Sequence, residues 1–306
     1  MRRHRTTLRP RWTATLLAAP LGVAAAVLGL ASCGTSPAPS TTEGPRTAAS
    51  PMLVVVSAYP LAQLVSYLGG KALDVIDLAP PGARSQGLSL TPAQQSMVRA
   101  ALLVIDVGDG YQPRVEAAAA TAHRHISVLP AVSRQARPYE FWLDPYLMAR
   151  AATVIAGALT TADPAEREQF QNGARDFQAV ANSVESDFVN NFTQCARNEF
   201  VTADDAFGRM AASFDLADVA VTTTGVNKAV ALVVQGSLPA VFSEIGVPSG
   251  AVQQVARDSR VSVKSLDPME ITPSAGTSAL SYFSVMEEDL TALEGPLACD
   301  TSEDFA

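Results

Sequence analysis

The chain has 306 residues, of which 48% are hydrophobic and 17% charged, so it exceeds one ordinary domain and is too apolar for a disordered protein. Its formal charge is −8, which becomes −13 without the first 32 residues, because that segment holds five arginines and no acid. A protein this acidic repels a phosphate backbone, which argues against nucleic-acid binding. From the length we expect two lobes with separate cores.

The first 32 residues have the layout of a secretory signal peptide, with a basic start, an apolar run over 13–31 and small residues at the end. The small residues that precede Cys33 resemble a bacterial lipobox, which predicts that Cys33 becomes the lipidated first residue of the mature protein. A plain transmembrane anchor is the alternative, since about 19 apolar residues nearly span a bilayer. Residues 33–50 are rich in Ser, Thr, Pro and Ala, which predicts a flexible tether.

Strand-like and helix-like stretches alternate over residues 51–163, which we expect to form an N-terminal lobe. Short apolar runs predict strands at 53–56, 73–78, 102–107 and 126–129. Helical spacing and capping residues predict helices at 59–68, from 91, at 112–122 and from 145 to about 160. This alternation predicts a parallel sheet with helices on both faces.

A long helix is expected over residues 164–192. Asp163 can accept hydrogen bonds at its start, and Pro164 suits the first helical position. Apolar residues then recur at alternating spacings of four and three, a single stripe along one helix face: Phe170, Ala174, Phe177, Ala181, Val184 and Phe188. At 1.5 Å per residue this helix would be about 43 Å long, enough to connect and brace two lobes.

The same rhythm returns in residues 193–306, the expected C-terminal lobe. Strands are predicted near 200–202, 218–222, 240–243 and 261–266, and helices near 205–214, 226–235, 249–257 and 277–293. The predicted fold is therefore α/β, with two lobes, each a small parallel sheet with helices on both faces, joined by one long rigid helix. Such a fold places a ligand between the lobes, at the carboxyl ends of the strands.

Two cysteines remain in the mature chain if Cys33 is lipidated. Cys195 follows the long helix and Cys299 lies near the C-terminus, and neither has a CxxC partner that would indicate a redox or zinc centre. Outside the cytoplasm the compartment permits disulfides, so we expect a Cys195–Cys299 bond that closes the second lobe. Two free buried thiols are the alternative.

The sequence contains no motif of a common enzyme class: no GxSxG elbow, no GxGxxG turn and no Walker loop. His123 and His125 flank Arg124 at the end of an alanine-rich stretch, where we expect both rings to be exposed to solvent. With no histidine near a candidate nucleophile, we expect a protein that is not an enzyme.

Six short motifs in a fixed order resemble one family over essentially the whole mature chain from about residue 53. They are Val54–Leu61, Pro80-Pro81-Gly82 with Thr91-Pro92, Phe141–Pro145, Phe200–Gly208, Phe242-Ser243-Glu244 and Leu266-Asp267-Pro268, with the long helix between the third and the fourth. In these motifs the chain resembles the zinc/manganese family of substrate-binding lipoproteins of ABC importers. The resemblance implies two α/β lobes joined by one rigid helix, in agreement with the pattern of elements.

The resemblance also implies a function. The protein would be anchored by lipid at the extracytoplasmic face of the bacterial cell membrane and would capture a divalent cation, Mn²⁺ or Zn²⁺, between its lobes. It would pass this cargo to an ABC permease and its ATPase, and we expect it to be a monomer. The alternative is a binding protein of the same fold that has lost the metal site and binds another small ligand or a surface partner.

Four metal-ligand positions follow from the resemblance. Histidine is usual in the family where this chain has Gln86 and Glu140, and histidine or glutamate is usual where it has Asp204. Aspartate is usual at the fourth position, and Asp267 matches it. Three of the four positions have therefore changed to residues that offer oxygen.

Two further acids are reserve candidates for the metal. Asp205 takes the place of Asp204 as ligand if the loop is shifted, or it caps the next helix. Glu244 follows a predicted strand and could face the space between the lobes.

The change of ligand type has a physical consequence. The four positions offer only oxygen donors, and oxygen-rich sites suit Mn²⁺, Ca²⁺ or Mg²⁺, whereas imidazole favours Zn²⁺. The residues therefore predict that Mn²⁺ is favoured over Zn²⁺ as cargo. Without an ion, three carboxylates pressed together would repel one another and raise one another's pKa.

Overall fold

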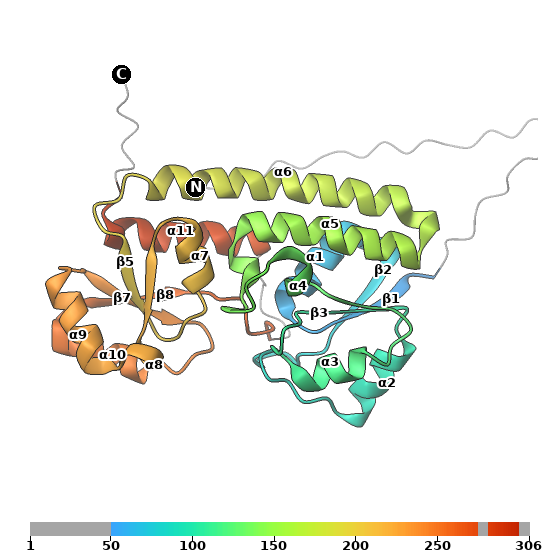
Figure 1. Ribbon diagram of the computed structural model, residues 1–306, viewed down its shortest axis with the longest axis horizontal. Coiled ribbons are helices and arrows are strands. Elements are labelled where there is room, and N and C mark those ends of the chain that lie inside the picture. Colours follow the sequence, from blue (N-terminus) through green and yellow to red (C-terminus); the bar gives the residue numbers. More distant parts are fainter. Residues whose placement is uncertain (1–49, 275–280, 300–306) are drawn as a thin grey trace, which may run out of the picture. The chain divides into compact units, whose positions relative to one another are not determined.

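The computed structural model describes residues 50–274 and 281–299, which form two lobes connected by a long helix (Figure 1). The expected signal peptide, Cys33 and all of the tether except residue 50 lie outside the described residues. Among the residues that are described, no helix is long and apolar enough to cross a membrane.

The N-terminal lobe is built on one four-stranded parallel sheet. Its strands are β1 (Met52–Val56), β2 (Leu73–Asp77), β3 (Leu103–Asp106) and β4 (His125–Ser127), in the spatial order β2-β1-β3-β4. Its helices are α1 (Tyr59–Gly69), α2 (Pro92–Ala100), α3 (Pro113–Ala119), α4 (Leu129–Val132) and α5 (Pro145–Ala162), and its 3₁₀ turns are η1 (Gly70–Ala72) and η2 (Phe141–Leu143). Because the strands are parallel, the loops that follow them meet at one edge of the sheet.

Local sequence explains where two of these helices begin. Thr91 accepts a hydrogen bond from the amide of Gln94 (3.2 Å), and the Gln94 side chain accepts one from the amide of Thr91 (2.8 Å), so the pair forms a capping box at the start of α2. The Asp144 carboxylate accepts a hydrogen bond from the amide of Leu147 (3.2 Å) at the start of α5. This second cap lies directly after the turn η2 and marks the start of α5.

One expectation about the histidines is wrong. His123 is exposed as expected, but His125 lies on β4, and its Nε2 is 2.6 Å from Oδ2 of the fully buried Asp106. A buried carboxylate needs a polar partner, and the neighbouring strand supplies one. The alanine-rich helix ends before β4, so the second histidine belongs to the sheet.

The connecting helix α6 spans Arg167–Phe192 and follows a short 3₁₀ turn, η3 (Pro164–Glu166). Asp163 accepts a hydrogen bond from the amide two residues later (3.1 Å), so the helical segment begins where it was expected, with a first turn that is 3₁₀. The apolar stripe is buried along the whole helix. Gly173 also lies on this buried side. A Cβ at this position would be only 2.6 Å from the backbone oxygen of Leu68 in α1, so no larger residue fits there. The glycine therefore permits the close approach of α1 and α6.

The C-terminal lobe contains two small parallel sheets, one of β5 (Glu199–Thr202) and β6 (Ala217–Ala220), the other of β7 (Ala240–Glu244) and β8 (Ser262–Leu266). Its helices are α7 (Gly208–Ser213), α8 (Val221–Thr224), α9 (Val226–Gln235), α10 (Gly250–Ser259) and α11 (Tyr282–Leu297). The strand expected over 218–222 stops at 220, because the next four residues form α8. The expected start of the last helix, at 277, lies outside the described residues, and α11 continues beyond 293 to residue 297.

A single large core runs through both lobes, so the expectation of two separate cores is wrong. Phe177, in the middle of α6, contacts Tyr67 of α1 with ring centroids 5.2 Å apart and Phe283 of α11 with centroids 4.8 Å apart. The same cluster of buried side chains includes β1 and β3 of the first lobe and Phe200 and Phe242 of the second. Two smaller clusters belong to one lobe each. Both lobes therefore share the apolar side of α6.

A disulfide joins Cys195 to Cys299, which lie 104 residues apart in the sequence. It connects the segment after α6 to the end of α11, and beside it the amide of Ala196 donates to the carbonyl of Ala298 (3.1 Å). The C-terminal lobe is closed covalently near the two ends of its described chain.

Buried polar contacts hold the two lobes against each other. Nε1 of the fully buried Trp142 donates to the carbonyl of Pro268 (2.8 Å), and the Tyr282 hydroxyl donates to the carbonyl of Trp142 (2.8 Å). Arg209 of α7, also buried, donates through Nε to the carbonyl of Pro138 (3.0 Å). Separating the lobes would leave these groups without partners, which costs free energy.

Candidate functional site

The loop after β2, residues 80–87, reaches across to the segment that follows β8. The amide of Ser85 donates to the carbonyl of Glu270 (3.0 Å), and Arg84 pairs with Ile271 in an isolated antiparallel bridge. These backbone contacts hold Arg84 next to the second lobe, at the edge where the strands of both lobes end.

The guanidinium group of Arg84 binds two carboxylates of the second lobe. Its Nη2 is 3.1 Å from Oδ2 of Asp204 and 2.5 Å from Oε2 of Glu270. The side chain of Glu270 is 1% exposed and that of Asp204 16%, whereas that of Arg84 is 30% exposed. Although burial opposes its charge, the carboxylates of Glu270 and Asp204 raise the pKa of Arg84, so it stays cationic.

Glu140, directly before η2 in the first lobe, brings a second carboxyl group to Glu270. The side chain is buried, and burial together with the Glu270 carboxylate raises the pKa of Glu140 far above its usual range. Burial also raises the pKa of Glu270, although the Arg84 charge opposes this shift. Two carboxyl groups this close do not both ionise readily, so the pair retains a proton near neutral pH.

A second pair of carboxyl groups, Asp204 and Glu244, lies within the C-terminal lobe. Asp204 follows β5, and its amide donates to Oε1 of Glu244 at the end of β7 (2.8 Å). Burial and the Asp204 carboxylate raise the pKa of Glu244 well above its usual range. On the adjacent strand β6, burial raises the pKa of Asp218 to about 8. The reserve candidate Asp205 is exposed, so only Glu244 of the two reserve candidates lies beside Asp204.

The structure separates the four predicted ligands into two groups. Glu140 and Asp204 both lie near Glu270. Gln86, by contrast, is exposed on its loop. Asp267 is half-buried, and its Oδ1 accepts a hydrogen bond from the amide two residues later (2.8 Å), so this carboxylate stabilises the turn after β8.

Over residues 50–274 and 281–299, no three His, Cys, Asp or Glu side chains are arranged to hold a metal ion. The predicted ligands therefore do not form a coordination shell in this arrangement. Two of the predicted ligands have other partners instead: the Asp204 carboxylate is bound by Arg84, and the Asp267 carboxylate accepts a hydrogen bond within its own turn.

Sequence reasoning missed Arg84 and Glu270. Arg84 stands two residues before Gln86, and a permanent positive charge beside expected acids was a usable signal, because such a charge either repels a metal ion or binds those acids itself. Glu270 carried no comparable signal. It directly follows Met269, which has a φ of +54°, and its carbonyl accepts a hydrogen bond from the amide of Ser85, next to Arg84.

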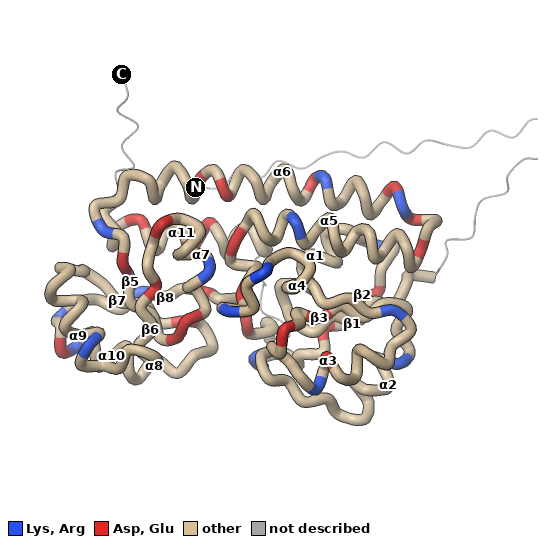
Figure 2. Tube along the Cα trace, viewed as in Figure 1, with Lys and Arg blue, Asp and Glu red and all other residues tan. Residues whose placement is uncertain are grey.

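The resulting site consists of four carboxyl groups from four separate segments with one guanidinium group among them. We call it the interlobe cluster: Arg84, Glu140, Asp204, Glu244 and Glu270. Figure 2 shows acidic and basic positions together in the loops between the lobes. The cluster has more negative groups than one arginine can neutralise, and protons on the carboxyl pairs make up part of the difference.

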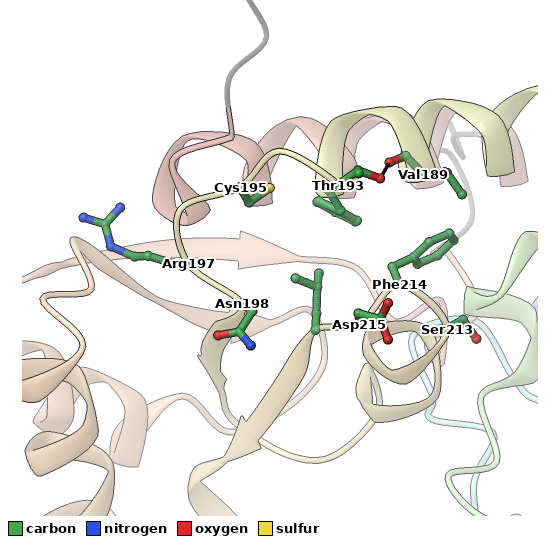
Figure 3. A pocket seen from close by; sticks show the side chains of 10 residues that line it. Val189, Thr193, Cys195, Arg197, Asn198, Ser213, Phe214 and Asp215 are labelled. Atoms are coloured by element: carbon green, nitrogen blue, oxygen red, sulfur yellow. Dashed lines mark hydrogen bonds between the residues drawn. The ribbon is translucent and has the colours of Figure 1, made fainter.

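A cavity of about 360 Å³ lies elsewhere, at the end of α6 (Figure 3). Figure 3 shows Phe214 and Asp215 from the loop after α7 on one side and Thr193 and the disulfide-bonded Cys195 on the other. Asp215 is the one acidic residue among those that line it. A single carboxylate supplies too few oxygen donors for a divalent cation, so the interlobe cluster is the better candidate site.

The family comparison gives a match over most of the chain. The sequence profile described as zinc-uptake complex component A, periplasmic, matches residues 54–295. No curated protein matches the chain in sequence at a significant level.

Solved structures share the fold at low sequence identity. The laminin-binding protein Lmb of Streptococcus agalactiae, described as having adhesin and metal transporting activity, is 19% identical with a TM-score of 0.74, over 81% of this chain and 99% of that chain. The zinc-bound ZnuA-like domain of Streptococcus pneumoniae AdcA is 17% identical with a TM-score of 0.70, over 81% and 99%. The metal-dependent lipoprotein YcdH of Bacillus subtilis is 18% identical with a TM-score of 0.71, over 80% and 99%. These likenesses establish the two-lobe fold.

Proposed function

Because this chain belongs to the zinc-uptake complex component A family, the substrate-binding proteins of metal ABC importers, we propose that it captures a divalent cation at the interlobe cluster for import. Members of this family are transport components and not enzymes. The partners would be an ABC permease and its ATPase. The chain would act as a monomer at the extracytoplasmic face of the membrane, anchored through a lipid on Cys33.

The observation that carries this proposal is the excess of carboxyl groups over cations in the interlobe cluster. Glu140 pairs with Glu270, and Asp204 pairs with Glu244, while Arg84 supplies the one positive charge of the cluster. Carboxyl groups gathered at this density are costly to bury without compensation. A divalent cation would supply that compensation and would release the protons that the pairs retain.

The donor type favours manganese as cargo. The interlobe cluster offers carboxylate oxygen and no imidazole or thiolate, and hard oxygen donors suit Mn²⁺ better than they suit Zn²⁺. Zinc has the higher intrinsic affinity for most sites, so the preference is a relative gain for Mn²⁺ over a site built from histidine.

Calorimetric titration of the metal-stripped mature chain with MnCl₂ and ZnCl₂ tests the proposal. The double variant Glu140→Gln/Asp204→Asn keeps the side-chain volumes and removes two carboxylates of the cluster. We expect it to weaken Mn²⁺ binding by more than about 100-fold, since even outer-shell partners of a metal contribute about 10–100-fold.

A matched control removes the same two charges from exposed helix positions, Glu168→Gln/Asp258→Asn. This control should bind Mn²⁺ as the unchanged chain does. The single variant Asp267→Asn should change affinity little, because the Asp267 oxygen already serves its own turn. Equal affinities in the cluster variant and the control would refute the proposed site.

The ion pairs of Arg84 favour one alternative. In it, the protein has the same fold, the charge of Arg84 takes the place of the metal, and the protein binds another small ligand or a surface partner. Native mass spectrometry after refolding with Mn²⁺, with Zn²⁺ or without metal separates the two. Retention of one ion per chain supports metal capture, and its absence at saturating concentration supports the alternative.

A further inference from the structure

The Arg84 guanidinium group and a captured cation need the same oxygen atoms. Nη2 of Arg84 is 3.1 Å from Oδ2 of Asp204 and 2.5 Å from Oε2 of Glu270. A metal ion bound through either oxygen would lie within a few ångströms of the guanidinium group, where two positive charges repel each other strongly. The ion and the bound form of Arg84 therefore exclude each other.

The guanidinium group is able to leave while the backbone stays in place. The backbone of Arg84 is held by its bridge to Ile271, but the side chain is 30% exposed and so adjoins solvent. Nε of Arg84 is buried and has no hydrogen-bond partner among the described residues. The bound position thus leaves one donor unsatisfied, and a long arginine side chain readily places its charged end in water.

Withdrawal of Arg84 would free the oxygens of Asp204 and Glu270 for a cation, which would then have to draw a further carboxylate toward them to complete its donor set. In the present arrangement no three acids of the described chain are placed to hold an ion. With the guanidinium group gone, the carboxylates of Asp204 and Glu270 lose the positive charge that Arg84 supplies, and the repulsion between the acids of the cluster rises. An ion with two positive charges compensates three carboxylates better than an arginine with one.

We propose that Arg84 is a built-in competitor of the cargo: its guanidinium group occupies the Asp204 and Glu270 carboxylates, and a divalent cation binds only when this group withdraws. Arg84 thereby sets the cation concentration at which the chain loads and helps to expel the ion during delivery. This inference rests on the proposed function, because it concerns the same cluster and the same cargo.

Calorimetric titrations with MnCl₂ and ZnCl₂ on three forms of the mature chain test the competition: unchanged, Arg84→Gln and Arg114→Gln. Glutamine keeps much of the side-chain length and removes the charge. Arg114 is exposed in the same lobe and donates to Ser89 (3.1 Å), so its variant controls for the loss of one positive charge. We expect Arg84→Gln to bind Mn²⁺ at least about tenfold more tightly than the other two forms.

The outcomes separate this inference from the proposed function. If Mn²⁺ binds the unchanged chain and Arg84→Gln with equal affinity, the competition is overturned and the proposed function stays in place. Weaker binding of Mn²⁺ to Arg84→Gln has the same consequence. Binding in Arg84→Gln but not in the unchanged chain supports the competition and refutes capture by the native sequence. Absence of binding in all three forms overturns both.

A second measurement avoids the risk that Arg84→Gln, which leaves Glu270 buried without a counter-charge, fails to fold. In the unchanged chain labelled with ¹⁵N, the Nε–H signal of Arg84 is assigned by its absence in Arg84→Lys and followed during titration with Zn²⁺, which is diamagnetic. Displacement predicts that this signal moves to the position of a solvent-exposed arginine in proportion to the bound ion. An Arg84 signal that does not change while Zn²⁺ binds would overturn the proposal.

Discussion

The two lobes differ in how their sheets are completed. In the N-terminal lobe the strands form one continuous sheet, and all four residues of β3 are buried. In the C-terminal lobe the strands are divided between two pairs, and four of the five residues of β8 are exposed. The other strands do not repeat this difference in burial, since β2 and β4 of the first lobe are mostly half-exposed and β7 of the second is mostly buried. The lobes therefore differ in the continuity of their sheets and in the disulfide that closes the second.

The lobes also differ in what they bring to the interlobe cluster. The N-terminal lobe supplies the guanidinium group of Arg84 and the carboxyl group of Glu140, and the C-terminal lobe supplies Asp204, Glu244 and Glu270. The contact between lobes is therefore electrostatic at the strand ends and apolar along α6. The predictions that follow test the apolar contact, the covalent closure of the second lobe and the hydrogen bonds between the lobes.

The largest effect is expected at the shared apolar contact. Phe177→Ala removes a ring that is 1% exposed and touches aromatic rings of α1 and α11, so it should lower the free energy of unfolding by about 3–5 kcal/mol. Val180→Ala, on the same helix at a position that is 39% exposed, is the control and should cost less than about 1 kcal/mol. Urea unfolding measures both, and similar losses would contradict a shared core.

Removal of the disulfide should affect the C-terminal lobe selectively. The double variant Cys195→Ser/Cys299→Ser opens a loop of 104 residues, which should cost about 2–4 kcal/mol by increasing the entropy of the unfolded chain. Amide hydrogen exchange should become faster in β5–β8 and stay nearly unchanged in β1–β4. Equal acceleration in both lobes would show that they open together and would weaken the contrast drawn above.

The contact from α7 to the first lobe should have a smaller effect. Arg209→Gln removes hydrogen bonds from a buried guanidinium group to carbonyl groups of the first lobe and should cost about 1–3 kcal/mol, whereas Arg99→Gln at an exposed position of α2 should cost almost nothing. Trp142 is the only tryptophan after residue 32 and bonds to Pro268 across the lobes, so its fluorescence reports on their contact. Its emission should shift to longer wavelength in Arg209→Gln, and an unchanged spectrum would contradict a role in holding the lobes.

The smallest effect is expected at Asp77, which ends β2 and accepts a hydrogen bond from the Thr272 hydroxyl (2.9 Å). Burial raises the pKa of Asp77 from 3.8 to about 6, so its protonated form is favoured by folding, and this contribution is lost as the pH rises through about 6. The Thr272 hydroxyl opposes that shift by stabilising the ionised form. Thr272→Val should therefore cost about 1 kcal/mol at pH 8 and less at pH 5.

Thermal unfolding at both pH values checks this last prediction, with the unchanged chain as reference at each. A cost that is larger at pH 5 than at pH 8 would mean that the hydroxyl supports the neutral carboxyl group, opposite to the assigned direction.

Part of the candidate site followed from the family resemblance of the sequence. That resemblance implied Glu140 and Asp204, which stand directly before a helical turn and two residues after a strand, and both reach the interlobe cluster. Gln86 stands in a comparable loop, but Arg84, two residues earlier, points into the cluster in its place. Which residue of an irregular loop faces inward depends on the backbone bridge to Ile271, and no local pattern encodes that bridge.

The sequence by itself determined the elements of this protein: the buried stripe of α6, the alternation of strands and helices, and the capped starts of α2 and α5. These features arise from interactions between residues a few positions apart, so periodicity and capping reveal them. Only the tertiary structure decided that both lobes share one core and that Arg84 meets Asp204, 120 residues away, in place of a coordination shell. Contacts of that range depend on how whole elements pack, and a charge finds its partner only after packing has brought the two together.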